Sequence, residues 1–203
     1  MSLKRTLSLV ERFRRKDRTT PLVLMGYYNP IHAYGAERFA RDAGAAGVDG
    51  LITVDLGPEE DSFLRGTAAK SGLDIIRLAT PTTDDARLAT VLNGASGFLY
   101  YVSIAGVTGT KTFTQEDVKR AVQRIRQVTD LPCVAGFGIR TPDQAQAIAG
   151  FADGAAVGSS IVSRIAENLK DGKSCVTLVE DTLGFCGGLA DAVHKARKSP
   201  LGA

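Results

Sequence analysis

The chain has 203 residues and a net charge of +3, with 44% hydrophobic and 23% charged residues, as in ordinary soluble globular domains. A chain of this length can bury a core without disulfide or metal support. Its 22 glycines follow neither a collagen repeat nor a low-complexity run. Fibrous and disordered classes are therefore excluded, and we expect one domain over residues 1–203.

The three cysteines, Cys133, Cys175 and Cys186, lie far apart and form neither a CxxC pair nor a Cys/His cluster. This spacing predicts no disulfide framework and no zinc site. The first residues also lack the apolar stretch of a secretory signal. We therefore expect a protein of the reducing cytoplasm.

The charge is unevenly distributed along the chain. Residues 1–18 hold seven basic and two acidic residues, a net charge of +5, which leaves −2 for the rest. A basic end on an acidic body is typical of a solvated helix face, so no nucleic-acid partner is expected. The 23 uncharged residues between Arg87 and Lys111 are long enough to cross a membrane. They contain too many glycine, serine and asparagine residues to do so, and no membrane contact is expected.

Six short apolar runs recur, and each is followed by a turn and then a helical pattern. Runs with little polar alternation favour strands buried on both faces, joined by right-handed helical crossovers into a parallel sheet. The runs cover residues 22–25, 51–54, 75–78, 97–102, 132–135 and 155–157. The predicted fold class is α/β.

Three helix starts carry capping signals. Thr114 with Asp117 predicts a capping box, Thr141 with Gln144 predicts a second cap before a proline at the first helical position, and Thr82 with Asp85 predicts a third. A further helix over residues 3–15 is predicted from its apolar stripe, and no strand precedes it in the sequence.

The six strands allow two architectures. A closed parallel barrel takes eight strand–helix units and typically about 250 residues, so one alternative is a barrel without its first two strands. The other alternative is a doubly wound sheet, which would usually open with a strand and a glycine-rich turn. No GxGxxG follows residues 22–25, which favours the barrel.

The last two predicted strands end in glycine. Gly136, Phe137 and Gly138 close one strand and lead to the Thr141 cap, while Gly158 and Ser159 close the next and open a helix. Glycine lets the backbone approach an anion, and free N–H groups at a helix N-terminus donate to it. In barrels, the loops after the last two strands are the usual phosphate site. Tight strand-to-helix turns are the alternative explanation for these glycines.

A third loop, residues 103–110, follows the longest predicted strand. It is small, uncharged and rich in glycine, as a closing lid would be. A plain structural connector is the alternative.

The sequence resembles the alpha chain of tryptophan synthase over about residues 3–170. The segments that carry this resemblance occur in the order of that family. They are residues 25–30, 47–52, 54–56, 58–60, 79–83, 97–109, 136–139 and 157–159.

The resemblance implies a (β/α)8 TIM barrel in which this chain holds the strands equivalent to 3–8. The implied reaction is cleavage of indole-3-glycerol phosphate to indole and glyceraldehyde 3-phosphate, without cofactor or metal, in partnership with the beta chain. The implied phosphate ligands are backbone groups of Gly109, Gly138, Gly158 and Ser159. The implied substrate-binding residues are Tyr27, Tyr100 and Phe137, with Thr108 as the lid threonine.

The sequence departs from the family at the catalytic residues. The family's catalytic Glu ends its second barrel strand and its catalytic Asp follows, both upstream of the helix that begins here at Leu3. The resemblance assigns Asp55, Glu59 and Glu60 to loop support, helix capping and the rim that faces the partner, with Glu59 and Glu60 opening a helix. Gly57 stands where the family usually has Pro, in a turn toward the beta chain.

Two functional hypotheses follow. In the first, the chain is an N-terminally truncated alpha chain whose full-length parent is the lyase and which is itself inactive. In the second, it is a non-catalytic barrel remnant that binds phosphate or a partner. A third, a nucleic-acid binder, rests only on the basic N-terminal helix. Missing strands would expose sheet edges, so self-association across those edges is expected.

Overall fold

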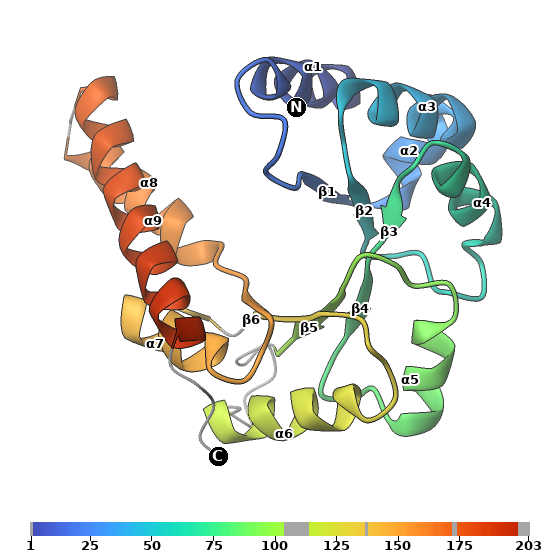
Figure 1. The fold of residues 1–203 in the computed structure, drawn as a ribbon. Helices are drawn as coiled ribbons and strands as arrows, with labels where there is room; N and C mark the ends of the chain where they lie inside the picture. The colour runs from blue at the N-terminus through green and yellow to red at the C-terminus, as the bar shows by residue number, and fades with distance from the viewer. Residues whose placement is uncertain (1, 104–113, 137, 172–173, 199–203) are drawn as a thin grey trace. The chain divides into compact units, whose positions relative to one another are not determined.

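The computed structural model describes residues 2–103, 114–136, 138–171 and 174–198, over which strands and helices alternate along the chain (Figure 1). The chain divides into two compact units. Unit 1 comprises Met1–Ala79 and Thr83–Leu99, and unit 2 comprises Thr80–Thr82 and Tyr100–Ala203. None of the described helices is long and apolar enough to span a membrane.

Unit 1 is built on a parallel three-stranded sheet in the order β1 (Val23–Gly26), β2 (Gly50–Thr53) and β3 (Asp74–Ile75). Leu24 lies opposite Leu51, and Leu51 lies opposite Ile75. A short strand, β4 (Arg77–Ala79), follows β3. The helices of this unit are α1 (Leu3–Arg14), α2 (Tyr28–Tyr34), α3 (Ala36–Ala46), α4 (Ser62–Lys70) and α5 (Asp85–Leu92).

The predicted strand over residues 75–78 is interrupted at Ile76, so that β3 and β4 are separate. Ile76 donates its amide hydrogen to the carbonyl of Leu51 at 3.0 Å. The Ile75 amide instead donates to the Ser96 hydroxyl at 2.9 Å, and the Ile75 carbonyl accepts from the Ser96 amide at 2.9 Å. Successive strand residues direct their backbone groups to opposite sides, so a loop serine takes the place of a neighbouring strand on the side of Ile75 that faces away from β2.

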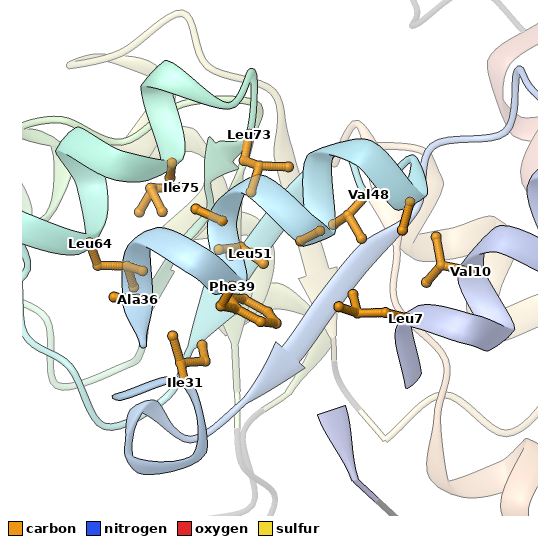
Figure 2. Close-up of a cluster of buried hydrophobic side chains, with 14 residues drawn as sticks. Leu7, Val10, Ile31, Ala36, Phe39, Val48, Leu51, Leu64, Leu73 and Ile75 are labelled. Carbon is orange, nitrogen blue, oxygen red and sulfur yellow. The ribbon is translucent and has the colours of Figure 1, made fainter. Parts of the chain in front are cut away.

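Figure 2 shows the hydrophobic core of unit 1. Leu7 from α1, Phe39 from α3 and Leu64 from α4 meet Leu51 and Ile75 from the sheet, and all five side chains are buried. Fully burying a side chain of this size contributes about 1.5–3 kcal/mol. The apolar stripe predicted for residues 3–15 is confirmed at Leu7 and Val10, which are buried, whereas Phe13 is 39% exposed; α1 ends one residue earlier than expected.

Unit 2 contains β6 (Cys133–Gly136) and β7 (Gly154–Ala155), and β5 (Leu99–Val102) enters this unit at Tyr100. The strand order is β5-β6-β7. Three buried residues of α6 (Gln115–Arg126), namely Val118, Val122 and Ile125, form its inner face. The other helices are α7 (Pro142–Ala149), α8 (Ser159–Lys170) and α9 (Cys175–Lys198), and α9 packs on α7 and α8.

Two of the three predicted helix caps are confirmed. Thr114 and Asp117 form a reciprocal capping box at the start of α6, and the Thr141 hydroxyl accepts the Gln144 amide hydrogen at 3.3 Å. The third prediction is wrong, because Asp84 caps α5 by accepting from the Arg87 amide at 2.7 Å. The Thr82 hydroxyl is hydrogen-bonded to that of Thr80. A carboxylate one residue before the helix thus replaces the expected hydroxyl.

Removing the capping hydroxyl in Thr114→Ala is expected to lower the free energy of unfolding by about 1 kcal/mol, the usual cost of losing a threonine cap. Asp117 would lose the Thr114 hydroxyl that donates to it at 2.8 Å. Hydrogen bonds from the backbone and hydroxyl of Thr114 lower the pKa of Asp117 to about 2. Urea titration measures the loss. A matched Thr90→Ala change within α5, where the Thr90 hydroxyl makes a long 3.4 Å hydrogen bond to the Ala86 carbonyl, should leave stability within about 0.5 kcal/mol, and equal losses in both variants would contradict the assignment.

Candidate functional site

The candidate site lies in unit 2, where β6 and β7 end side by side. The two strands are parallel neighbours, with Val134 opposite Gly154 and Ala135 opposite Ala155. Segments that follow parallel neighbours leave from the same edge of the sheet. The glycine loops that follow β6 and β7 are therefore brought together, as the sequence predicted.

A side-chain hydrogen bond joins the two loops directly. The Ser160 hydroxyl, in the first turn of α8, donates to the carbonyl oxygen of Ile139 at 2.8 Å. Sequence reasoning did not single out Ser160 for this role, since the partner lies 21 residues away. Gly138, next to Ile139, has a φ of +48°, a left-handed conformation that glycine adopts at no steric cost.

Helix α8 begins without a side-chain cap. Gly158 is its N-cap, and the Ile161 and Val162 amides donate to the Gly158 carbonyl at 3.0 and 3.1 Å. Gly158 and Ser159 are exposed, and a Cβ added at Gly158 would meet no heavy atom within 4 Å. The open space lies at the positive end of the helix dipole, which favours an anion.

Tyr100 lies against the end of β6. A Cβ built on Gly136 would come within 2.6 Å of the Tyr100 hydroxyl oxygen, so only glycine allows this contact. The tyrosine is half-buried, and burial raises the pKa of Tyr100. The glycine at 136 thus makes room for an aromatic side chain beside the two glycine loops.

The roles of the remaining predicted substrate residues stay predictions. Tyr27 belongs to unit 1, where it follows β1 and is 66% exposed. Thr108, Gly109 and Phe137 lie outside the described residues, as does most of the predicted lid loop.

The acidic residues of the loop between β2 and α4 are held by partners within unit 1. Asp55 accepts the Tyr28 amide hydrogen at 2.7 Å, which agrees with the predicted loop support. Glu59 pairs with Arg87, and that hydrogen bond lowers the pKa of Glu59. The prediction that Glu59 and Glu60 open the helix is wrong: they form a turn, and α4 begins at Ser62 after Asp61.

All three cysteines are free thiols. Cys133 is fully buried, and burial raises its pKa to about 11, so its thiol stays protonated and unreactive near neutral pH. Among the described residues, no group of three or more His, Cys, Asp or Glu side chains could hold a metal ion.

Parallel strands alternating with helices, and glycine loops at the strand ends, define an α/β protein of the (β/α)8 barrel class. The sequence model of the tryptophan synthase alpha chain family matches residues 1–194. The chain belongs to this family, whose members are lyases of tryptophan biosynthesis.

Solved structures give the same result. The tryptophan synthase alpha chain of Legionella pneumophila is 36% identical with a TM-score of 0.85, and the match covers 96% of this chain and 70% of that chain. Tryptophan synthase of M. tuberculosis is 33% identical with a TM-score of 0.80, over 95% and 69%. A structure of the alpha2beta2 complex from Pyrococcus furiosus is 28% identical with a TM-score of 0.79, over 94% and 74%.

Proposed function

We propose that this chain binds the substrate of the indole-3-glycerol phosphate lyase reaction. The observation that carries the proposal is the pair of parallel strand ends, β6 and β7, whose loops are joined by the Ser160–Ile139 hydrogen bond. The open space before α8 suits a phosphate group at this edge.

The proposed phosphate ligands are backbone N–H groups of Gly138, Gly158 and Ser159, together with Gly109 from the loop outside the described residues. Free N–H groups at the first turn of α8 supply directed donors, and the helix dipole adds a favourable potential. Ser160 and Gly136 act indirectly. Ser160 joins the two loops through its hydrogen bond to Ile139, and Gly136 leaves room for Tyr100.

The indole and glycerol groups would extend from the phosphate toward aromatic side chains. The contact of Tyr100 with Gly136 supports this role for Tyr100, and Tyr27, Phe137 and Thr108 are proposed from the family resemblance. Aromatic side chains offer the large apolar faces that an indole ring needs.

The reaction cleaves a carbon–carbon bond by a retro-aldol step. It must protonate the indole ring carbon that bears the side chain and remove a proton from the glycerol hydroxyl, which calls for two positioned acid–base groups. In unit 1, Asp55, Glu59 and Asp61 are already engaged by Tyr28, Arg87 and Arg77. We assign no catalytic residue within these 203 residues, and the alternative function remains a non-catalytic domain that binds phosphate or a partner.

The proposed partner is the beta chain of tryptophan synthase, by analogy with the alpha2beta2 complex of the Pyrococcus furiosus relative. We also propose a cytoplasmic site of action, one domain over residues 1–203, and a reaction that needs no cofactor and no nucleic acid. β1 lies at an edge of its sheet, so self-association through that edge is a further expectation.

The phosphate assignment is tested by replacing Gly158 with Asp. The new carboxylate would occupy the open space before α8 and repel the phosphate, so binding of indole-3-glycerol phosphate should weaken at least tenfold in isothermal titration calorimetry. Gly158 has a φ of −128°, outside the left-handed region that favours glycine.

Gly184→Asp is the matched control. Gly184 is an exposed glycine in α9 that also has no heavy atom within 4 Å of an added Cβ, so it receives the same charge in similar space. It should bind the substrate as the unaltered chain does. Equal binding by Gly158→Asp and the unaltered chain would refute the phosphate assignment.

A further inference from the structure

Unit 1 contains a polar cavity of about 300 Å³ outside the proposed substrate site. Its walls are the loop after β2 (residues 53–58), β4 with the preceding Ile76, and α5 with the residues before it. Two arginines, Arg77 and Arg87, line the cavity from opposite elements. None of the substrate or phosphate roles assigned above uses a residue of this cavity.

Arg77 lines the buried side of the cavity. The residue is 5% exposed, and one terminal nitrogen of its guanidinium, Nη2, pairs with Asp61, which is 1% exposed. Its Nε has no hydrogen-bond acceptor. A buried donor without an acceptor is costly. Burial also lowers the pKa of Arg77, and Asp61 only partly opposes this effect.

Arg87 lines the side of the cavity that is accessible to solvent. Its side chain is 46% exposed and pairs with Glu59, whose side chain is 53% exposed. An exposed ion pair of this kind is weak, so the guanidinium can share its hydrogens with a second acceptor. The cavity thus has a buried donor at depth and an exposed donor near the solvent.

We propose that this cavity binds a small oxyanion, a phosphate or a carboxylate, between Arg77 and Arg87. The anion's oxygens accept from the guanidinium of Arg87 and, once the Arg77 side chain turns its buried Nε toward the cavity, from that unpartnered Nε as well. Arginine presents several donors in a planar fork that matches both oxyanions. This site shares no residue with the glycine loops of unit 2, because all of its residues belong to unit 1.

The surrounding charges set the expected strength. The carboxylates of Asp55, Glu59 and Asp61 balance the guanidiniums of Arg65, Arg77 and Arg87, and Arg65 Nε lies 3.7 Å from Asp61 Oδ1. Binding therefore depends on directed hydrogen bonds rather than on net charge. We expect millimolar affinity, and only a modest loss when sodium chloride is added.

The test follows the arginine Nε–H signals by NMR while inorganic phosphate is added at constant ionic strength. The Arg77 and Arg87 signals should shift and saturate together. In Arg87→Gln the Arg77 signal is the readout, and the dissociation constant should rise roughly tenfold or more, as for loss of a charged hydrogen bond. Arg126→Gln, which removes a 41% exposed arginine paired with Asp153, should leave it unchanged.

Two further titrations test where the anion binds and which anion is preferred. The same titration on Gly158→Asp should give the same Arg77 shift, because the unit 2 loops are not involved. A parallel titration with acetate shows which oxyanion the cavity prefers, and saturable binding of either supports the proposal. An Arg77 signal that does not move, that moves without saturation for both anions, or that loses its response in Gly158→Asp overturns it.

Discussion

Replacing Asp61 with Ala is expected to lower the free energy of unfolding by about 3–5 kcal/mol, because the change leaves the buried Arg77 guanidinium without its partner. The Asp61 and Arg77 side chains are 1% and 6% exposed. Burial already lowers the pKa of Arg77 in the presence of Asp61. Loss of Asp61 would therefore leave the buried charge of Arg77 uncompensated.

A double variant separates charge from packing. Asp61→Leu combined with Arg77→Met removes both charges at similar volume, and such replacements are often neutral or stabilising. Urea titration of Asp61→Ala, Arg77→Met and the double variant should show two large losses and a small change for the double. A double variant as unstable as either single would contradict this account of the pair.

Phe39→Ala should lower the free energy of unfolding by about 3–5 kcal/mol, the usual range for a buried phenylalanine. The side chain is 1% exposed in α3 and meets Tyr34 edge-on, with ring centroids 6.0 Å apart. Its loss leaves a cavity at the centre of the cluster in Figure 2.

Phe63 offers the matched control, since it is 57% exposed in α4. Phe63→Ala should change stability by less than about 1 kcal/mol. Thermal and urea unfolding of both variants measure the difference. Similar losses in the two would show that the core is not centred on Phe39.

Local signals in the sequence were sufficient for the helix starts of unit 2. The Thr114 and Thr141 caps depend on residues three positions apart, so their chemistry is visible without tertiary structure. Thr82 failed as a cap because Asp84 stands nearer the helix start and a carboxylate serves equally well.

Contacts between distant residues could not be predicted in this way. Ser96 hydrogen-bonds to the backbone of Ile75 from 21 residues away, and Arg77 engages Asp61 from 16 residues away. At the turn that contains Glu59, the Glu60 amide donates to the Gly57 carbonyl, and Glu59 and Asp61 pair with arginines of α5 and β4.

The candidate site was partly predictable. The pattern of glycines marked both strand ends, and their order suggested a phosphate site, because glycine at a strand-to-helix turn has a local signature. The adjacency of β6 and β7, the Ser160 bridge and the contact of Tyr100 with Gly136 depend on register and packing.

The most direct test of the account measures indole release from indole-3-glycerol phosphate by a polypeptide of these 203 residues, with and without the beta chain. Loss of one acid–base group typically costs about 10²–10⁴ in rate, and we assign neither group to this sequence. The alpha chain of the Legionella pneumophila relative serves as the positive control. We predict saturable substrate binding with no indole released. Sustained indole release by this polypeptide would contradict the account.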